Sequence, residues 1–414
     1  MTELVARTVA LPDGLPLDMI AIGGADGALL FAQEHLSIAA RGSALRIPIP
    51  RGLEDPSATA DALELLRSVK VEDDVRGRGS GPLAIGALPF DRRRPTELVV
   101  PAVLVGQDGS GGRWMTTVGA AGDEPRATIE ALSSLPDFVA PDRFSLVSSR
   151  THQDWCAVVE RAIDTIRGTE LEKVVLAREV VVDANRPFLP ADILRRLHAL
   201  YPSCAVFAVD GFVGASPELL VSRRGTQISS HPLAGTVARS GDATADERLV
   251  AAMWASPKER REHQLVVDAV AAALRPVCAK LDVPMQPSIM SLRNVSHLGT
   301  HVEGDLDPLD PPSALDLVAR LHPTPAVAGT PRAVAVEFID EHEGVDRGRY
   351  AGAVGWMSAD GDGEWAVGIR SAEIRGRRAR LYAGVGIVDG SDPAGELAET
   401  QLKLQALLAA VVRP

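Results

Sequence analysis

The sequence predicts an α+β fold whose strands are mainly antiparallel. In the second part of the chain, strand-like runs follow one another, joined by hairpins and flanked by helical segments: residues 173–182, 205–212, 218–223 and 227–230. Regular alternation of strand and helix, the mark of a parallel sheet, is missing from this pattern. No repeat of fixed period indicates a solenoid.

Bulk properties favour a soluble enzyme. The chain has 414 residues and is 46% hydrophobic, which is enough to bury a large core. Its formal net charge of -12 and the lack of a sustained Lys/Arg run argue against nucleic acid or an anionic membrane as a partner. An acidic chain that binds an acidic ligand must therefore supply positive charge locally.

Cysteine usage and the N-terminus predict a cytoplasmic location. Cys156, Cys204 and Cys278 are few, widely spaced and odd in number, as expected for reduced thiols. Residues 1–7 lack secretory character, and the apolar stretch 266–274 is too short to cross a bilayer.

The first part of the chain, to about residue 145, mixes short strands such as 98–100 and 102–105 with Gly/Pro-rich connections. The loop 76–82 resembles a phosphate loop only in its glycines. It lacks the Gly-Lys-Ser/Thr ending and a preceding apolar strand, so we interpret it as a surface turn.

A helix over residues 152–168 leads into the apolar strand 173–182, which opens with Lys173. Desolvation at this position would make Lys173 a base, whereas a lysine at a frayed, solvated strand end is the commoner arrangement. Glu218 stands at the entrance of another strand, after Pro217. It is a proton donor if buried, or else a surface turn residue.

A helix starting at Ser256 and Pro257 carries two glutamates toward its buried face. At about 100° per residue, the stripe Val266, Ala269, Val270, Ala273 and Val277 runs back onto Glu262 and, less squarely, onto Glu259. Buried carboxylates are usually paired or bound to a metal, so this face predicts a cation site or a proton-transfer site. The alternative is that Glu259 closes a capping box with Ser256 and that Glu262 lies at a wet helix end.

Strands at 364–372 and 379–388 flank a turn at residues 375–378. Arg370 interrupts the first strand, and symmetry about the turn brings it near Tyr382 and the backbone amides at residues 384–386. An inward arginine beside exposed amides suits a carboxylate or a phosphate.

A C-terminal helix begins after Ser391 and Asp392 and presents Glu396, Glu399 and Lys403 on one face. Taken alone, this set is a solvated charged face. Because a predicted anion site immediately precedes this helix in the chain, we interpret the charged face as part of that site, with a metal adjacent to it. The pair His297 and His301 has the spacing of a zinc-binding helix, but no glutamate follows the first histidine and the segment contains a glycine.

Ordered motifs over residues 150–408 resemble the chorismate-utilising enzymes, the anthranilate synthase component I-like family, and within them the isochorismate synthases. The motifs are residues 173–178, 214–220, 231–236, 261–263, 322–326, 350–356, 369–370 and 384–403. Before about residue 145 the match is weak. The resemblance implies one large domain over residues 1–414, with antiparallel sheets packed together, helices outside and a catalytic portion at 150–408.

The resemblance also implies the site. Glu262 and Glu399 would bind Mg²⁺, supported by Glu259 and Glu396. Lys173 would be the general base that activates water for attack on C2 of chorismate, and Glu218 the general acid that protonates the departing C4 hydroxyl. The implied substrate-binding residues are Gly235, Thr236, His297, Ala326, Tyr350, Arg370, Gly384, Gly386 and Lys403.

Single positions divide the family. Glutamine is typical at position 173 of anthranilate synthases and lysine at position 234 of aminodeoxychorismate synthases, so Lys173 with Ala234 favours water addition. Ala326 favours a synthase that stops at isochorismate, while Tyr350 is typical of salicylate synthases, which go on to eliminate pyruvate. A non-catalytic chorismate sensor is the third alternative. No amidotransferase subunit is expected, the chain is predicted to be a monomer, and the product would serve siderophore, salicylate or menaquinone biosynthesis.

Overall fold

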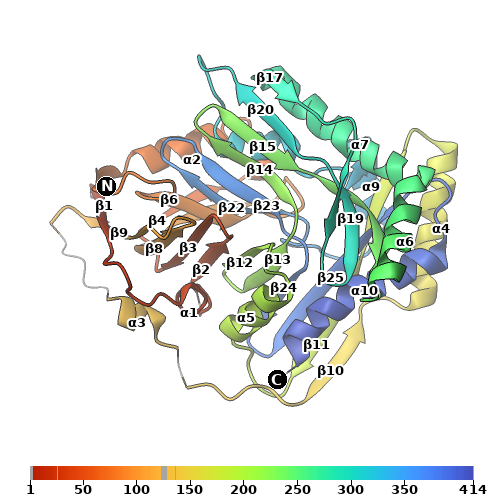
Figure 1. The fold of residues 1–414 in the computed structure, drawn as a ribbon, viewed down its shortest axis with the longest axis horizontal. Helices are drawn as coiled ribbons and strands as arrows, with labels where there is room; N and C mark the ends of the chain where they lie inside the picture. Colours follow the sequence, from red (N-terminus) through yellow and green to blue (C-terminus); the bar gives the residue numbers. More distant parts are fainter. Residues whose placement is uncertain (1–2, 26, 123–127, 136, 414) are drawn as a thin grey trace.

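The predicted α+β fold with large antiparallel sheets is confirmed by the computed structural model, which describes residues 3–25, 27–122, 128–135 and 137–413. Two large sheets pack face to face through a core that contains Phe31, Phe207 and Trp356. Further apolar clusters fill the outer faces of both sheets, beneath the helices. The residues of the first 145 positions that lie in strands contribute to both large sheets (Figure 1).

The larger sheet has thirteen strands within the described residues. In spatial order they are β10 (Phe144–Ser148), β11 (Lys173–Ala184), β25 (Arg378–Ile387), β24 (Ser371–Arg375), β13 (Phe212–Ser216), β12 (Ala205–Val209), β2 (Leu29–Ala32), β3 (Leu36–Arg41), β8 (Val103–Asp108), β9 (Arg113–Ala120), β1 (Leu4–Ala10) and β5 (Lys70–Asp73), with β21 (Gly329–Thr330) paired to β11. The longest pairing joins β11 to β25 in antiparallel register, with Val175 opposite Gly386.

The second sheet has nine strands in the described part of the chain. They are β17 (Cys278–Asp282), β20 (Val302–Leu306), β15 (Gln227–His231), β14 (Leu219–Arg224), β23 (Gly363–Val367), β22 (Ala353–Ser358), β6 (Leu83–Ala87), β7 (Thr96–Val100) and β4 (Leu45–Ile49). A small third sheet consists of β16 (Leu233–Ala238), β19 (Val295–Gly299) and β18 (Ser288–Ser291).

Helices surround the sheets, and several of them gather at the end of the molecule opposite the N-terminal strands (Figure 1). They are α1 (Met19–Gly23), α2 (Ala58–Arg67), α3 (Ile129–Ser133), α4 (His152–Gly168), α5 (Pro190–Leu200), α6 (Ala243–Ala255), α7 (Pro257–Leu274), α8 (Ala314–Leu321), α9 (Arg332–His342) and α10 (Pro393–Val412), with 3-10 turns η1 (Gly52–Glu54) and η2 (Arg275–Val277). The predicted start of α7 is confirmed, because the Ser256 side chain accepts the Glu259 N–H. Asp392 caps α10 in the same way through Gly395.

Two predicted strands are wrong in extent. The run 205–212 is a hairpin of β12 and β13, whose turn holds Asp210 and Gly211 at positive φ. The run 364–372 is two strands in different sheets, β23 and β24, and the chain changes sheet at Arg370, whose φ is +48°. Left-handed backbone is costly for a side chain with a Cβ, and it is found mostly where the surroundings impose it.

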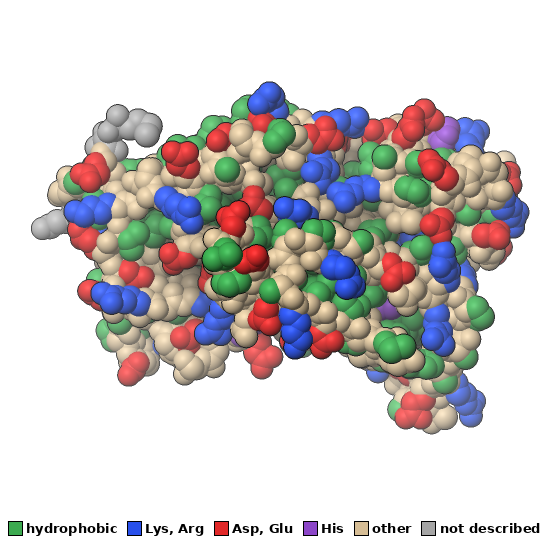
Figure 2. All heavy atoms as spheres, turned by 90° about the horizontal axis from the view of Figure 1, so that it is seen from above, with side chains coloured by type: hydrophobic (Ala, Val, Ile, Leu, Met, Phe, Trp, Pro, Cys, Tyr) green, Lys and Arg blue, Asp and Glu red, His purple; other side chains and the backbone are tan. Residues whose placement is uncertain are grey.

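Charge on the surface is mixed. On the face shown in Figure 2, acidic and basic side chains are interspersed without a large area of one sign. Within the described residues, we find no helix that is both long enough and apolar enough to span a bilayer.

Candidate active site

A central pocket collects the predicted site residues from β11, β16, β19, β25, α7, α10 and the loops beside them. All but three of the site residues predicted from the sequence line it. They are Glu218, Gly235, Thr236, Glu262, His297, Ala326, Tyr350, Arg370, Gly384, Gly386, Glu399 and Lys403. The other three lie beside the pocket. Lys173 pairs with Glu262, and Glu259 accepts the N–H of Thr236. Glu396 shares Lys258 with Glu259.

Lys173 is the first residue of β11 and is completely buried, so the solvated strand end considered above is wrong. Its Nζ lies 3.0 Å from Oε1 of Glu262 on α7. Gly386 on the neighbouring strand β25 makes this approach possible, since a Cβ there would overlap Oε1 of Glu262 and lie 2.9 Å from Cε of Lys173. The inward direction predicted for Glu262 is confirmed.

Glu218 precedes β14 and is buried within the pocket wall. Burial raises the pKa of its carboxyl from 4.5 to about 8, against a backbone hydrogen bond from Leu233 and the charges of Lys173 and Lys403. The carboxyl is therefore protonated at neutral pH and can donate a proton inside the pocket.

The four glutamates of α7 and α10 meet at the pocket, and each has a lysine within 4 Å. Glu262 pairs with Lys173, Glu399 with Lys403 at 2.8 Å, and Glu396 with Lys258 at 2.8 Å. Lys258 also lies 3.8 Å from Glu259, its neighbour in the sequence, but it donates its hydrogen bond to Glu396, 138 positions away along the chain.

Glu259 also has a backbone partner. Its Oε2 accepts the backbone N–H of Thr236 at 3.1 Å, so the carboxylate that was predicted to close a capping box reaches across to β16. Burial first, and then the charge of Glu262, raise the pKa of Glu259 to about 7. Burial also raises the pKa of Glu396, although the charge of Lys258 opposes this. The carboxylates thus repel one another in a partly desolvated region.

Arg370 enters the pocket from the sheet-changing segment. Its Nη2 donates to Nε2 of His297 at 3.0 Å, and its Nη1 is buried without a hydrogen-bond partner among the described residues. Burial and the charge of Arg370 hold the pKa of His297 well below its usual range. Nδ1 of His297 therefore carries the proton and donates toward the Gly235 carbonyl, 3.3 Å away, and the Thr236 hydroxyl, 3.1 Å away. His297 orients Arg370, and the unpartnered donor of Arg370 is available to an anion.

The opposite wall is formed by backbone and aromatic rings. Lys403 donates to the Gly384 carbonyl at 2.9 Å. The Tyr350 ring stacks on Tyr382 with centroids 5.0 Å apart, and a Cβ at Gly384 would lie 2.9 Å from the Tyr350 hydroxyl. Basic donors beside aromatic rings suit a flat ring that bears carboxylates.

Sequence reasoning missed some contributors. Lys258 gave no local signal, because its partner lies on a distant helix. The buried ion pair of Glu343 and Arg347 lies behind the pocket wall, where Arg347 donates to the carbonyls of Val175 and Val327 at 2.7 Å each. Glu343 is the C-cap of α9 and Arg347 lies beyond the end of this helix, so helical periodicity gave no signal for the pair. The expectation that His297 and His301 form no zinc pair agrees with their surroundings, since His301 is exposed and pairs with Glu303.

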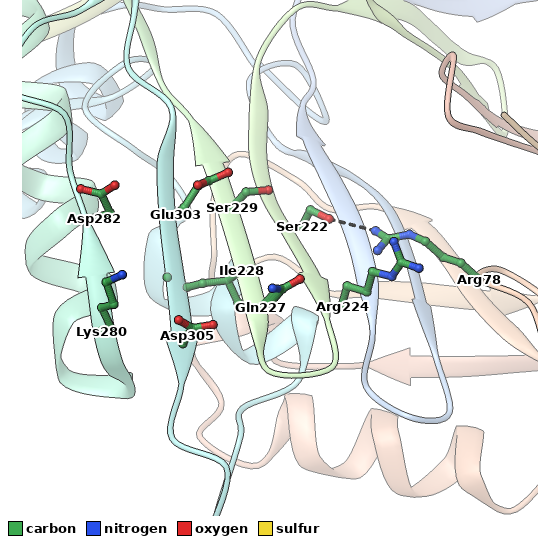
Figure 3. Close-up of a pocket in the computed structure, with 11 residues that line it drawn as sticks. Arg78, Ser222, Arg224, Gln227, Ile228, Ser229, Lys280, Asp282, Glu303 and Asp305 are labelled. Carbon is green, nitrogen blue, oxygen red and sulfur yellow. Dashed lines mark hydrogen bonds between the residues drawn. The ribbon is translucent and has the colours of Figure 1, made fainter. Parts of the chain in front are cut away.

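A second hollow lies on the nine-stranded sheet (Figure 3). Arg78 and Arg224 lie on one side of it, and Lys280 lies on the other side with Asp282, Glu303 and Asp305. None of the predicted site residues lines this hollow. The predicted acid, base and anion-binding groups therefore converge on the central pocket.

Comparisons with known proteins agree with this geometry. A family described as "Chorismate binding enzyme" matches residues 29–412. Isochorismate synthase DhbC of Bacillus subtilis is 37% identical over 93% of this chain and 94% of its own length. Isochorismate synthase EntC of Escherichia coli is 35% identical over 81% of this chain and 83% of its own length. The solved structure of MenF, the menaquinone-specific isochorismate synthase of E. coli, is 26% identical and superposes with a TM-score of 0.82, covering 100% of this chain and 95% of that one.

Proposed function

Because the chain belongs to the family of chorismate-binding enzymes and is an enzyme of the isomerase type, we propose that it converts chorismate to isochorismate. Water adds at C2 of the ring, the C4 hydroxyl leaves as water, and the ring double bonds shift between them. The observation that carries the proposal is that Glu218, whose pKa burial raises to about 8, lines the same pocket as Glu262, and that the buried Lys173 lies 3.0 Å from Glu262.

Lys173 is the general base. In its uncharged form, its Nζ takes a proton from the attacking water, whose oxygen forms the new bond to C2. Its complete burial keeps the group out of contact with bulk solvent, and Glu262 fixes the side chain. Because the overall exchange is one water in and one water out, the same residues serve the reverse reaction.

Glu218 is the general acid. Its protonated carboxyl donates to the C4 oxygen as the C–O bond breaks, and it is the group in the pocket with a pKa raised to about 8 by burial. Lys173 then holds one proton more and Glu218 one fewer, and transfer of that proton back to Glu218 through water in the pocket restores the starting states.

Arg370 and Lys403 bind the carboxylates of the substrate. Arg370 has a buried, unpartnered Nη1 in the pocket, and Lys403 is fixed between Glu399 and the Gly384 carbonyl. Charge-assisted bonds from such groups orient an anion strongly where water is excluded.

Mg²⁺ is the proposed cofactor, and the donor set fits it. Mg²⁺ prefers carboxylate oxygens and keeps several waters, and α7 and α10 supply mutually repelling carboxylates at the pocket edge. In the described part of the chain no three potential ligands are already arranged around one point, so the side chains would have to turn toward the ion. Glu262 and Glu399 would hold it, with Glu259 and Glu396 behind them. When bound, it supplies positive charge to the substrate carboxylates.

Replacement of Glu262 by glutamine is expected to weaken Mg²⁺ binding by about 10-fold or more, because a neutral amide replaces a charged ligand. Isothermal titration of the protein with Mg²⁺ measures this directly, and turnover against Mg²⁺ concentration should shift in parallel. The matched control is Glu172→Gln. Glu172 is an exposed glutamate that pairs with Arg261, a residue of α7 like Glu262. An unchanged titration for Glu262→Gln would reject the ligand assignment.

Replacement of Gly386 by alanine is expected to lower kcat/KM by about 100-fold. The added methyl group would push Glu262 and Lys173 apart, while the strand itself tolerates alanine. Steady-state kinetics with chorismate measures the loss. Gly168→Ala, where a Cβ meets nothing within 4 Å, is the control. Normal kinetics in Gly386→Ala would show that the close approach of these two side chains is unimportant.

Tyr350 supports salicylate synthase as the second candidate, because it lines the pocket and is typical of enzymes that eliminate pyruvate. Chromatography of products from chorismate, with Mg²⁺ and with chelator, separates the candidates. Isochorismate approaching a fixed ratio with chorismate is expected. Accumulating salicylate and pyruvate would support the second candidate, and saturable binding without turnover would indicate a sensor.

A further inference from the structure

Residues 88–94, which connect β6 to β7 in the N-terminal part of the chain, lie behind the pocket wall. We call them the 88–94 segment. The N–H of Leu88 donates to the Ala353 carbonyl at 2.7 Å, and the N–H of Phe90 donates to the Gly348 carbonyl at 2.9 Å. The segment is thereby joined to the chain on both sides of Tyr350, which lines the pocket.

His322 joins the segment to a second part of the wall. Its Nε2 lies 3.0 Å from the Pro89 carbonyl and 3.2 Å from the Phe90 carbonyl. Carbonyls only accept hydrogen bonds, so Nε2 carries the proton. Burial lowers the pKa of His322 to about 4, and the ring is neutral at pH 7.

The carbonyl of His322 accepts hydrogen bonds from two arginines. Arg92 Nη1 donates to it at 2.6 Å and Arg332 Nη1 at 3.0 Å. Arg92 also donates to the carbonyls of Ala319 at 2.5 Å and Leu53 at 3.2 Å. Among the described residues, Arg92 forms no ion pair within 4 Å, and the acceptors of these three hydrogen bonds are all backbone carbonyls. This geometry fixes the end of α8 and the turn that follows it.

That turn forms one wall of the pocket. The Thr324 carbonyl accepts the N–H groups of Val327 at 3.1 Å and Ala328 at 2.9 Å, which leaves Ala326 and Val327 facing the pocket. Behind them, Arg347 donates to the Val327 carbonyl. Its guanidinium lies 4.2 Å from the centre of the Phe90 ring, so the 88–94 segment supports this side of the turn as well.

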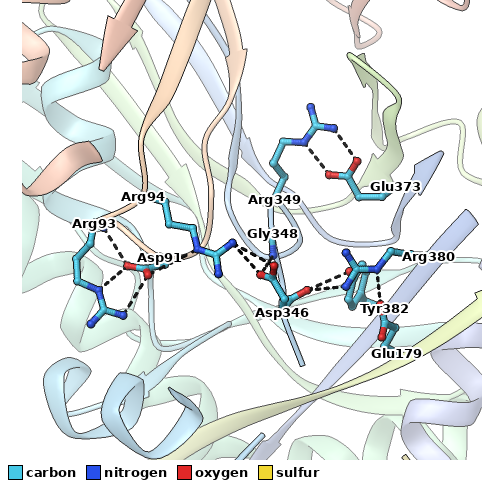
Figure 4. A network of polar contacts seen from close by, with 10 residues as sticks. All are labelled: Asp91, Arg93, Arg94, Glu179, Asp346, Gly348, Arg349, Glu373, Arg380 and Tyr382. Carbon is cyan, nitrogen blue, oxygen red and sulfur yellow. Dashed lines mark hydrogen bonds and ion pairs between the residues drawn. The ribbon is translucent and has the colours of Figure 1, made fainter. Parts of the chain in front are cut away.

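The same segment reaches the aromatic wall through an ion-pair network (Figure 4). Arg94 pairs with Asp346 at 2.9 Å, and the Asp346 carbonyl accepts the Tyr382 hydroxyl at 3.2 Å. The Tyr382 ring stacks on Tyr350. Arg93, between Arg92 and Arg94 in the sequence, instead pairs with Asp91 (Figure 4) and with Asp340 at the exposed surface.

We propose that the 88–94 segment is a positioning element for the reaction, and that Arg92 is its principal positioning residue, acting through His322 on the wall formed by Ala326 and Val327. The kinetic effect that we expect rests on the proposed function. The N-terminal part of the chain thereby contributes to catalysis. No residue of the 88–94 segment lines the pocket, but the segment fixes the position of residues that do.

Steady-state kinetics of Arg92→Ala, Arg92→Lys and Arg93→Ala tests the proposal. We expect kcat/KM for chorismate to fall by about 10- to 100-fold in Arg92→Ala, since a wall displaced by a fraction of an ångström misplaces the ring. Arg92→Lys should recover part of this loss, because one ammonium can still reach the His322 carbonyl. Arg93→Ala, an exposed neighbour, should stay within about 2-fold of the wild type.

Hydrogen–deuterium exchange gives a readout independent of turnover. Exchange at the Val327 and Ala328 amides should be faster in Arg92→Ala than in Arg93→Ala, at a temperature where both are folded. Wild-type kcat/KM with unchanged exchange in Arg92→Ala would overturn the proposal. If Arg92→Ala does not fold, the lysine variant decides: wild-type kinetics and exchange there would overturn it equally. If the wild-type protein makes no isochorismate, the proposed function is rejected. The positioning role is still tested by the comparison of amide exchange, which does not depend on turnover.

Discussion

Replacing Lys173 with alanine is expected to lower the rate of isochorismate formation by about 10²- to 10⁴-fold, the usual contribution of a general base. The lysine is completely buried at the start of β11, and its Nζ lies 3.0 Å from Glu262 beside the pocket. Substrate binding should persist, because Arg370 and Lys403 are unchanged. Product chromatography and a binding titration with chorismate measure the two quantities separately.

Loss of folding is the main confounding effect, since alanine leaves a cavity and removes the partner of Glu262. Lys173→Gln keeps most of the volume and the polarity, and it should lose the same activity. Lys280→Ala, an exposed lysine on β17, is the control and should behave as the wild type. Wild-type turnover in either Lys173 variant would contradict the assignment of the base.

Glu218→Gln is expected to lower kcat by about 10²- to 10⁴-fold, because an amide cannot donate the proton that the C4 oxygen needs. The matched control is Glu303→Gln, which changes an exposed carboxylate paired with His301. A variant at Glu218 that retains its kcat would remove the acid from the mechanism.

Stability should change in the opposite direction to activity in Glu218→Gln. At pH well below 4.5 the Glu218 carboxyl is protonated in the folded and unfolded chains alike. Between pH 4.5 and about 8 the unfolded chain releases this proton while the folded chain keeps it, so the wild type loses stability as pH rises through this window. Glutamine does not titrate. The melting temperature of the variant should therefore exceed that of the wild type increasingly from pH 5 to about 8, as thermal unfolding over this range would measure.

A stability difference that stays constant across this window would indicate that Glu218 titrates near its ordinary value. The same burial predicts that kcat of the wild type falls above pH of about 8, where Glu218 loses the proton it must donate.

Local patterns predicted those parts of the site that lie on regular elements. The 3.6-residue period placed Glu262 on the inward face of α7, and Ser256 and Asp392 marked the starts of α7 and α10 correctly. Lys173 was identified at the start of an apolar strand, but only the pairing of β11 with β25 and the packing of α7 decide that it is buried.

Irregular backbone was harder to predict. Asp210 and Gly211 both have positive φ, and an Asp-Gly pair between apolar runs is a hairpin signal that the sequence did contain. Arg370 carries no such signal. Its left-handed conformation is imposed by the change from one sheet to the other, a tertiary feature.

Contacts between segments that are far apart in the sequence could not be predicted from local sequence patterns. Lys258 bonds to Glu396 on another helix, and Arg92 bonds to the carbonyl of His322, 230 positions away. Neither side chain stands in a periodic pattern that would name its partner. The resemblance over residues 150–408 therefore indicated the catalytic groups that we propose, whereas the contacts of the N-terminal part were found only in the structure.

Incubating the protein with chorismate and Mg²⁺ in water enriched in oxygen-18, followed by mass spectrometry of the product, tests the central claim most directly. Water addition at C2 predicts isochorismate that carries one heavy oxygen in its new hydroxyl, with the C4 oxygen lost to solvent. Isochorismate without heavy oxygen, or a different product, would contradict the account.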